Sequence, residues 1–197
     1  MRTPIHSRLY LVVGLCWLLG AIGLAASGQL EQLRPPVPQL VVLGLTIALV
    51  AAGATVPGFR VWLAGLNLRQ IVALHITRFV GIYFLVLYGR GELPYAFAVP
   101  GGWGDILVAT GALILVLLVP DLLRRRPWLL AWNLFGLFDI LYVVATAARL
   151  AFADPSSMQS LLRLPLSLLP TFLVPLIIAS HVYLFGRLRA ERSQPAM

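Results

Sequence analysis

Long apolar runs alternate with short polar or proline-rich segments along the whole chain. A helix rises about 1.5 Å per residue, so roughly 20 apolar residues cross the hydrocarbon core of a bilayer. The pattern therefore predicts an all-α integral membrane protein, a six-helix transmembrane bundle that forms one domain over residues 1–197. The expected spans are at about residues 9–26, 37–56, 68–88, 105–120, 128–148 and 164–185.

The composition agrees with lipid as the main solvent. Of the 197 residues, 60% are hydrophobic and 11% are charged, and a soluble domain of this size cannot hide so much apolar surface from water. The net charge of +8 reflects 15 arginines against seven acids. Because these charges lie between the apolar runs, they form no basic face for nucleic acid. A single cysteine, Cys16, excludes an intrachain disulfide.

The first apolar run has two interpretations. Residues 1–27 resemble a signal peptide, because Ala25, Ala26 and Ser27 are small residues of the kind found at a cleavage site. The run from Leu9 to Ala26 is longer than an ordinary signal core of about 7–15 residues, and further spans follow it. We therefore expect a retained first helix, and cleavage is the alternative.

Six spans place both ends of the chain on one side of the membrane, and the arginines predict which side. Ten arginines fall in segments on the side of the termini, four fall on the opposite side, and Arg78 lies within a span. Positive charge favours the cytosolic side, so we expect an N-in, C-in orientation. The connection between the third and fourth spans, residues 90–104, is then an outer re-entrant or interfacial loop.

Several polar side chains inside the predicted spans fall at compatible depths. From the helical rise, His75, Asn133 and His181 each lie about 9 Å from the inner end of their span, Arg78 about 14 Å and Asp139 about 18 Å. An ionisable group at mid-bilayer costs roughly 2.5–3.5 kcal/mol, so these groups need partners or serve a function. We predict a polar intramembrane cavity that binds a ligand, lined by His75, Arg78, Asn133, Asp139, Tyr142 and His181.

Each of these residues also has a structural interpretation. Arg78 and Asp139 have opposite charges and can form an ion pair that fixes the register of two helices. Asn133 can make a hydrogen bond between helices. His75 and His181 can each be an interior imidazole with satisfied hydrogen bonds.

The segment after the third span carries candidates for an outer gate: Glu92, Trp103 and Asp105. Asp105 stands where the fourth span is expected to begin, and an acid at that position favours the positive end of the helix dipole. A helix cap is therefore the alternative for Asp105. Glu92 can instead be a solvated loop residue, and Trp103 can belong to an aromatic belt at the membrane surface.

No motif in the sequence points to a metal or a nucleotide. There is no HExxH, no CxxC and no phosphate-binding glycine loop, and no internal repeat is evident. We therefore predict no metal site and no cofactor, with one alternative. His75 and His181, on facing helices at one level, can serve as axial ligands of a b-type haem.

Three segments carry a resemblance: LPYAFAVPGGWGDILVATGA, WNLFGLFDILYVVATA and LPLSLLPTFLVPLIIASHVYLF. They resemble a group of uncharacterised bacterial multi-pass membrane proteins that have a GWGD segment, a WN..G..D helix and a proline-rich last helix ending in histidine. The resemblance covers about Gln70 to Phe185 and implies a small bacterial inner-membrane protein, without an assigned activity. It picks out Arg78, Gly102, Trp103, Gly104, Asp105, Trp132, Asn133, Asp139 and His181.

Four functions fit these observations. We favour a non-enzymatic binding protein or carrier for a small or lipophilic ligand. The alternatives are a b-type haem protein, a structural subunit, and an intramembrane isomerase or cyclase. In the enzyme, Asp139 or His181 would be the acid or base, and Arg78 would hold an anionic group. Membrane lipid is an expected partner, and the small-residue face at Gly44, Ala48 and Ala52 also suits a homo-oligomer.

Overall fold

The computed structural model of the chain describes residues 5–192, with the side chains of residues 8–190. Arg2 of the predicted basic head and the last residues of the C-terminal tail lie outside the described residues. Six helical segments in the described part are long and apolar enough to cross a membrane, as the sequence predicts. They are Arg8–Ala26, Val37–Thr55, Leu68–Gly89, Tyr95–Leu118, Arg126–Ala153 and Leu169–Ala190.

Five of the six spans begin and end within five residues of the predicted bounds, and the fourth does not. Helix α6 runs from Tyr95 to Leu118, with Pro100 inside it, so the prediction that this span starts at Asp105 is wrong. Proline and a run of glycines end most helices in water. In a membrane helix they are tolerated, because neighbouring helices can satisfy the freed backbone groups. Residues 95–104 are therefore helical rather than a re-entrant loop.

The connection before α6 is short and follows a regular helix ending. Helix α5 (Gly81–Gly89) is followed by Arg90 and then by Gly91, whose φ is 73°. The amide of Glu92 donates to the carbonyl of Leu87 at 2.9 Å, and the amide of Gly91 donates to that of Tyr88 at 2.9 Å. These two bonds form a Schellman motif, which needs the left-handed backbone that glycine adopts without a Cβ penalty.

The chain falls into two compact units, Met1–Leu66 with Ala151–Leu176, and Asn67–Leu150 with Ile177–Met197. Helices α7 (Arg126–Ala153) and α8 (Val174–Arg192) contribute to both. The expectation of one transmembrane domain stays a prediction beside this division.

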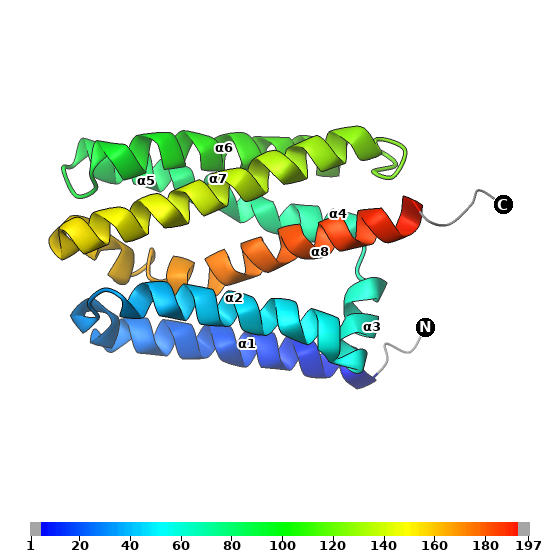
Figure 1. Cartoon of the computed structure of the whole chain (residues 1–197), viewed down its shortest axis with the longest axis horizontal. Helices are drawn as coiled ribbons and strands as arrows, with labels where there is room; N and C mark the ends of the chain where they lie inside the picture. Colours follow the sequence, from blue (N-terminus) through cyan, green and yellow to red (C-terminus); the bar gives the residue numbers. More distant parts are fainter. Residues whose placement is uncertain (1–4, 193–197) are drawn as a thin grey trace. The chain divides into compact units, whose positions relative to one another are not determined.

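The first unit contains three α-helices: α1 (Ile5–Ala26), α2 (Val37–Thr55) and α3 (Pro57–Gly65). It also holds the short 3-10 helices η1 (Gln29–Gln32) and η3 (Pro155–Leu162), and a π-helical turn, η4 (Leu169–Leu173). Helix α3 contacts both α1 and α2 (Figure 1). Aromatic rings make the contact with α1: Tyr10 lies 5.2 Å from Phe59 and 5.4 Å from Trp62 between ring centroids.

The second unit contains a transmembrane segment whose winding changes twice. Helix α4 (Leu68–Ala73) is followed by a seven-residue 3-10 helix, η2 (Leu74–Val80), and then by α5. Helix α4 begins with a capping box, in which the amide of Arg69 donates to the Asn67 side chain and the amide of Asn67 donates to that of Gln70. Both η2 and α5 pack closely against α6, and η2 carries His75 and Arg78.

Candidate functional site

Arg78 is the centre of a buried charged cluster in the second unit. Its side chain is 1% exposed, and each of its nitrogens has a partner. Nε donates to Asp105 at 2.5 Å, one terminal nitrogen donates to the carbonyl of Gly136 at 2.9 Å, and the other donates to Asp139. We call Arg78, Asp105 and Asp139 the charged triad. Since Arg78 lies on η2, Asp105 on α6 and Asp139 on α7, the triad joins three transmembrane segments.

Glycines make the approach of these segments possible. A Cβ on Gly81 would lie 2.7 Å from Cβ of Asp105 and would overlap the carbonyl of Gly102. A Cβ on Gly104 would overlap the carboxylate of Asp139, with the carboxyl carbon at 2.6 Å. Side-chain atoms at these two positions would therefore push α6 away from α5 and from α7. Small residues serve helix packing in lipid in the same way, by letting backbones come close.

The charged triad holds two carboxylates and one guanidinium, so its formal net charge is −1 when all three groups are ionised. Coulombic attraction within such a group offsets the cost of removing the charges from water. The attraction does not offset the second negative charge, because the hydrocarbon core supplies no counter-ion for it. The triad is therefore balanced only when a proton or another cation joins it.

A second cluster in the same unit is built around two histidines that are fully buried. The ring centroids of His75 and His181 lie 4.2 Å apart, and Trp132 packs edge-on against His75 at 5.0 Å. Nδ1 of His181 lies 2.7 Å from Oδ1 of Asn133, and Nε2 of His75 lies 3.0 Å from the Ser180 hydroxyl. We call His75, Asn133, Ser180 and His181 the histidine cluster.

The two clusters meet at Gly136 on α7. Its carbonyl accepts the hydrogen bond from Arg78. On its other side, a Cβ at this position would lie 2.7 Å from Cε1 and 3.0 Å from Nε2 of His181. One glycine therefore separates the guanidinium from an imidazole. In addition, His75 and Arg78 lie on one side of η2, since residues three apart in a 3-10 helix lie above one another.

Two imidazole nitrogens of the histidine cluster, Nδ1 of His75 and Nε2 of His181, are buried and have no hydrogen-bond partner. Free nitrogens of this kind are ligand or proton positions. They do not fit the haem hypothesis in this arrangement, because axial histidines must face opposite sides of a macrocycle. His75 and His181 instead touch each other directly. Among residues 8–190, no three His, Cys, Asp or Glu side chains come together to hold a metal ion.

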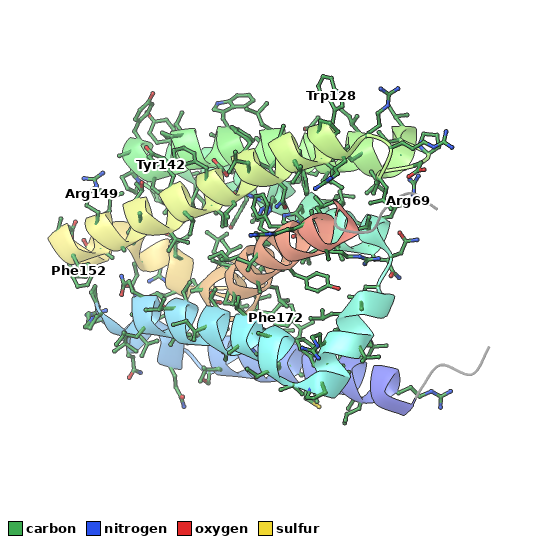
Figure 2. All side chains as sticks on the ribbon, turned by 45° about the vertical axis from the view of Figure 1, so that its right-hand side comes forward. Arg69, Trp128, Tyr142, Arg149, Phe152 and Phe172 are labelled. Carbon is green, nitrogen blue, oxygen red and sulfur yellow. The ribbon has the colours of Figure 1, made fainter. Side chains whose placement is uncertain are left out.

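The structure brings together most of the residues predicted to bind a ligand. Arg78 pairs with Asp139, and His75, Asn133 and His181 form one cluster, as their depths indicate. Tyr142 does not join them. It is 44% exposed on α7, whereas Asp139, three positions earlier on the same helix, is buried (Figure 2).

The three residues predicted to form an outer gate do not lie together in the structure. Glu92 lies in the turn before α6, and Trp103 is exposed on α6. Asp105 lies ten residues inside α6 and is buried against Arg78, so the prediction that it caps the start of a helix is wrong. Asp105 belongs to the charged triad instead.

Sequence reasoning missed two members of the clusters, Asp105 as a partner of Arg78 and Ser180 as a partner of His75, and it missed the Gly136 carbonyl between the clusters. One signal for Asp105 is present in the sequence. Gly101 and Asp105 are four residues apart, so they share one face of the helix if residues 95–104 continue the span. Ser180 is adjacent to His181 in sequence, and its partner His75 is 105 positions away. A contact at that separation follows from the packing of α8 and leaves no local pattern.

Comparison with known proteins gives a family without an activity. A model of one protein family, described as a domain of unknown function (DUF8737), matches residues 35–189. The match includes α2, which lies outside the resemblance expected from the sequence, and it is consistent with an uncharacterised group. No curated protein and no solved structure matches the chain.

Proposed function

The chain belongs to the DUF8737 family, and we propose that it is a membrane-embedded binding protein or carrier for a small or lipophilic ligand. The charged triad is the proposed ligand-binding centre. Six helices that are apolar enough to span a membrane make the chain a multi-pass membrane protein. We further propose a bacterial inner membrane as its location, with both termini in the cytosol, because of the distribution of arginines.

The observation that carries the proposal is the excess carboxylate beside Arg78. A purely structural ion pair needs one acid for one base, and here two acids share one guanidinium. The net negative charge of the triad favours a cation as the ligand. A proton can compete with that cation for the same two carboxylates. Exchange of a cation for a proton at one buried acid is a general way to couple transport to a proton gradient.

The histidine cluster offers a path for that proton. Hydrogen bonds and ring contacts form a chain through Ser180, His75, His181 and Asn133. His181 lies against Gly136, whose carbonyl accepts the hydrogen bond from Arg78. Imidazoles accept and release protons near neutral pH more readily than other side chains. The proposed role of the cluster is therefore to relay protons to and from the triad.

Infrared difference spectroscopy of the purified protein tests proton exchange at the triad. We expect a carboxyl C=O band whose amplitude changes with pH, and we expect Asp139→Asn to remove it or shift it. Asp121→Asn is the matched control, because Asp121 is an exposed acid outside the spans. A band that is identical in the wild type and in both Asp105→Asn and Asp139→Asn would contradict the proposal.

A flux measurement tests the carrier itself. Vesicles containing the protein and a pH-sensitive dye receive tetraethylammonium, a small organic cation that crosses lipid slowly. Exchange predicts a rise in luminal pH in the wild type and in Asp121→Asn, and a background rate in Asp139→Asn. If Asp139→Asn lowers stability but leaves the wild-type rate unchanged, the triad only fixes the helix register.

A further inference from the structure

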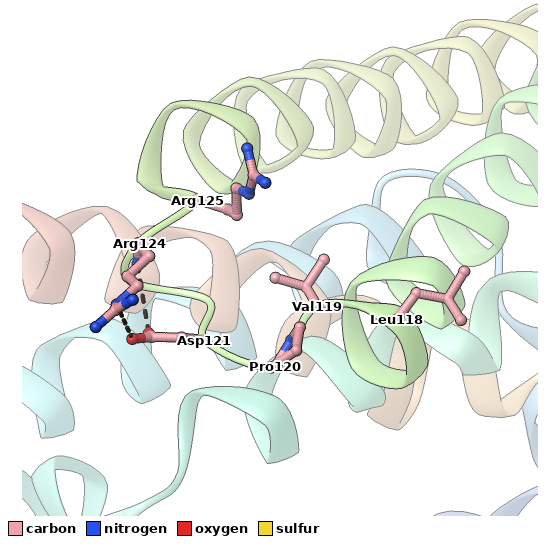
Figure 3. Close-up of a pocket in the computed structure, with 6 residues that line it drawn as sticks. All are labelled: Leu118, Val119, Pro120, Asp121, Arg124 and Arg125. Carbon is pink, nitrogen blue, oxygen red and sulfur yellow. Dashed lines mark hydrogen bonds and ion pairs between the residues drawn. The ribbon is translucent and has the colours of Figure 1, made fainter.

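A pocket lies where α6 ends and α7 begins, at the surface end of two transmembrane helices. Its volume is about 450 Å³, within the range of roughly 300–1,000 Å³ that small-molecule sites occupy. The six lining residues are Leu118, Val119, Pro120, Asp121, Arg124 and Arg125 (Figure 3). The site is separate from the charged triad, since none of its residues belongs to that cluster.

The pocket has more positive than negative charge. Arg124 pairs with Asp121 at 3.4 Å, and both side chains are largely exposed. Figure 3 shows Arg125 pointing away from that pair, and its guanidinium has no hydrogen bond or ion pair in the described part of the chain. The next residue, Arg126, has a buried Nε without a partner. With three arginines and one aspartate, residues 121–126 carry a net charge of +2.

The last carbonyls of α6 have an arginine as their hydrogen-bond partner, which makes this helix end compatible with a bound anion. The last carbonyls of a helix carry partial negative charge and disfavour an anion nearby. Here the guanidinium of Arg69, from α4, donates to the carbonyls of Val116 and Val119, and to that of Pro120 at 2.6 Å. Arg69 therefore neutralises these carbonyls and holds the loop in place.

Apolar side chains flank the charged pocket. Leu118 on its rim is 72% exposed, and Trp128 at the start of α7 is 70% exposed. An exposed tryptophan at the end of a transmembrane helix marks the level of the lipid headgroups. Exposed arginines beside exposed leucines suit a molecule that has a phosphate at one end and acyl chains at the other.

We propose that this pocket binds the phosphate of an anionic phospholipid from the surrounding bilayer. Arg125, which has no ion-pair partner among the described residues, contacts the phosphate oxygens, and Arg124 joins it by turning its exposed side chain from Asp121 toward the phosphate. The acyl chains lie along the exposed leucines at the end of α6. Free inorganic phosphate shares the same chemistry. The apolar rim and the position at a span end favour the lipid as the source.

Native mass spectrometry of the protein in mild detergent tests the site. The protein is mixed with equal amounts of phosphatidylglycerol and phosphatidylcholine, and the lipid retained is measured. We expect preferential retention of phosphatidylglycerol, with affinity reduced on the order of 10- to 30-fold in Arg124→Gln/Arg125→Gln, because each arginine near anionic lipid contributes several-fold. The matched control is Arg90→Gln/Arg149→Gln, which removes two exposed arginines elsewhere in the same unit and is expected to change the affinity less than twofold.

Three outcomes would overturn the inference. Equal retention of the two lipids would show that the phosphate of phosphatidylglycerol is not selected. An equal loss in the control would show that net charge, not the pocket, attracts the lipid. Displacement of the lipid by inorganic phosphate at the same molar concentration would make soluble phosphate the ligand. Because the readout is retained lipid, failure here leaves proton exchange at the triad untouched.

Discussion

The two units of the chain differ in what their helices bury. In the first unit, none of the α2 span is buried, and 11% of the α1 span is. Each of the four later spans, which lie wholly or mostly in the second unit, buries 39%. Lipid solvates apolar side chains as well as a protein interior does, so exposure of α2 costs little. Lipid does not solvate polar groups in this way. The helices of the second unit therefore pack against one another around the charged triad and the histidine cluster.

The ion pairs of the two units make the same contrast. Glu31 and Arg163 in the first unit form a pair at 2.8 Å that is largely exposed, while Arg78 in the second unit is enclosed. Exposed pairs contribute about 0–1 kcal/mol, because water and salt screen them. A buried pair is different, since the loss of one member leaves the other charged and without a partner.

The largest expected effect comes from breaking the buried cluster. Arg78→Met leaves two carboxylates facing each other, and we expect a loss of about 3–5 kcal/mol in the free energy of unfolding. Arg163→Met in the exposed pair is expected to cost at most about 1 kcal/mol. Denaturation of both variants in detergent micelles measures the difference. Equal losses would mean that burial does not distinguish the two pairs.

Glycine substitutions give a second, smaller contrast. Gly104→Ala places a methyl group on the carboxylate of Asp139, and we expect a loss of about 1–3 kcal/mol from overpacking. Gly44→Ala on α2 meets nothing within 4 Å and is expected to be neutral or to stabilise the helix by up to about 1 kcal/mol. The same denaturation assay compares the pair. A loss at Gly44 as large as that at Gly104 would show that α2 is packed against a partner.

Side-chain hydrogen bonds give a third contrast. Asn133→Ala removes the bonds to Nδ1 and to the carbonyl of His181, and we expect a loss of about 1–2 kcal/mol. Thr46→Ala on α2 removes only a local bond to the carbonyl of Val42 and is expected to change stability by less than about 0.5 kcal/mol. Melting temperatures in detergent report both. A Thr46→Ala effect equal to that of Asn133→Ala would remove the distinction between local and interhelical bonds.

The smallest effect concerns a single exposed turn in the first unit. The hydroxyl and the amide of Ser156 donate to Asp154 and lower its pKa below the usual value of 3.8. A lowered pKa means that this stabilisation is present above the pKa of the unfolded chain and is lost as pH falls through the folded value. The NMR shift of the Ser156 amide should therefore titrate with a midpoint below 3.8. In Asp154→Asn the titration should be absent. A midpoint above 3.8 would contradict the prediction.

The sequence predicts the spans that have uniform composition and fails where composition misleads. Arg78 and Asp139 are recognisable because charge is rare and costly inside an apolar run. Asp105 is not, since Pro100 and the glycines around it look like a loop when they are judged by rules for water. Those glycines pack against α5 and α7, a reason that becomes visible only when the three helices are placed together.

The limits at the histidine cluster have another origin. Depth along each helix predicts that His75, Asn133 and His181 share a level, because helical rise is constant. Rotation about each helix axis is set by packing, and it decides which side chains point inward. Tyr142 therefore points outward although its depth is suitable, and Ser180 joins the cluster although nothing in the sequence marks it.

The 3-10 winding of η2 has a mechanical consequence. An α-helix turns by about 100° per residue and a 3-10 helix by about 120°. Over the seven residues from Leu74 to Val80, the difference adds up to about 140°. Rewinding η2 into an α-helix would therefore rotate α5 against α4 by more than a third of a turn and shorten the segment by about 3.5 Å. It would also turn the guanidinium of Arg78 away from the side of the helix that carries the imidazole of His75. The winding of η2 therefore sets the positions of both clusters relative to each other.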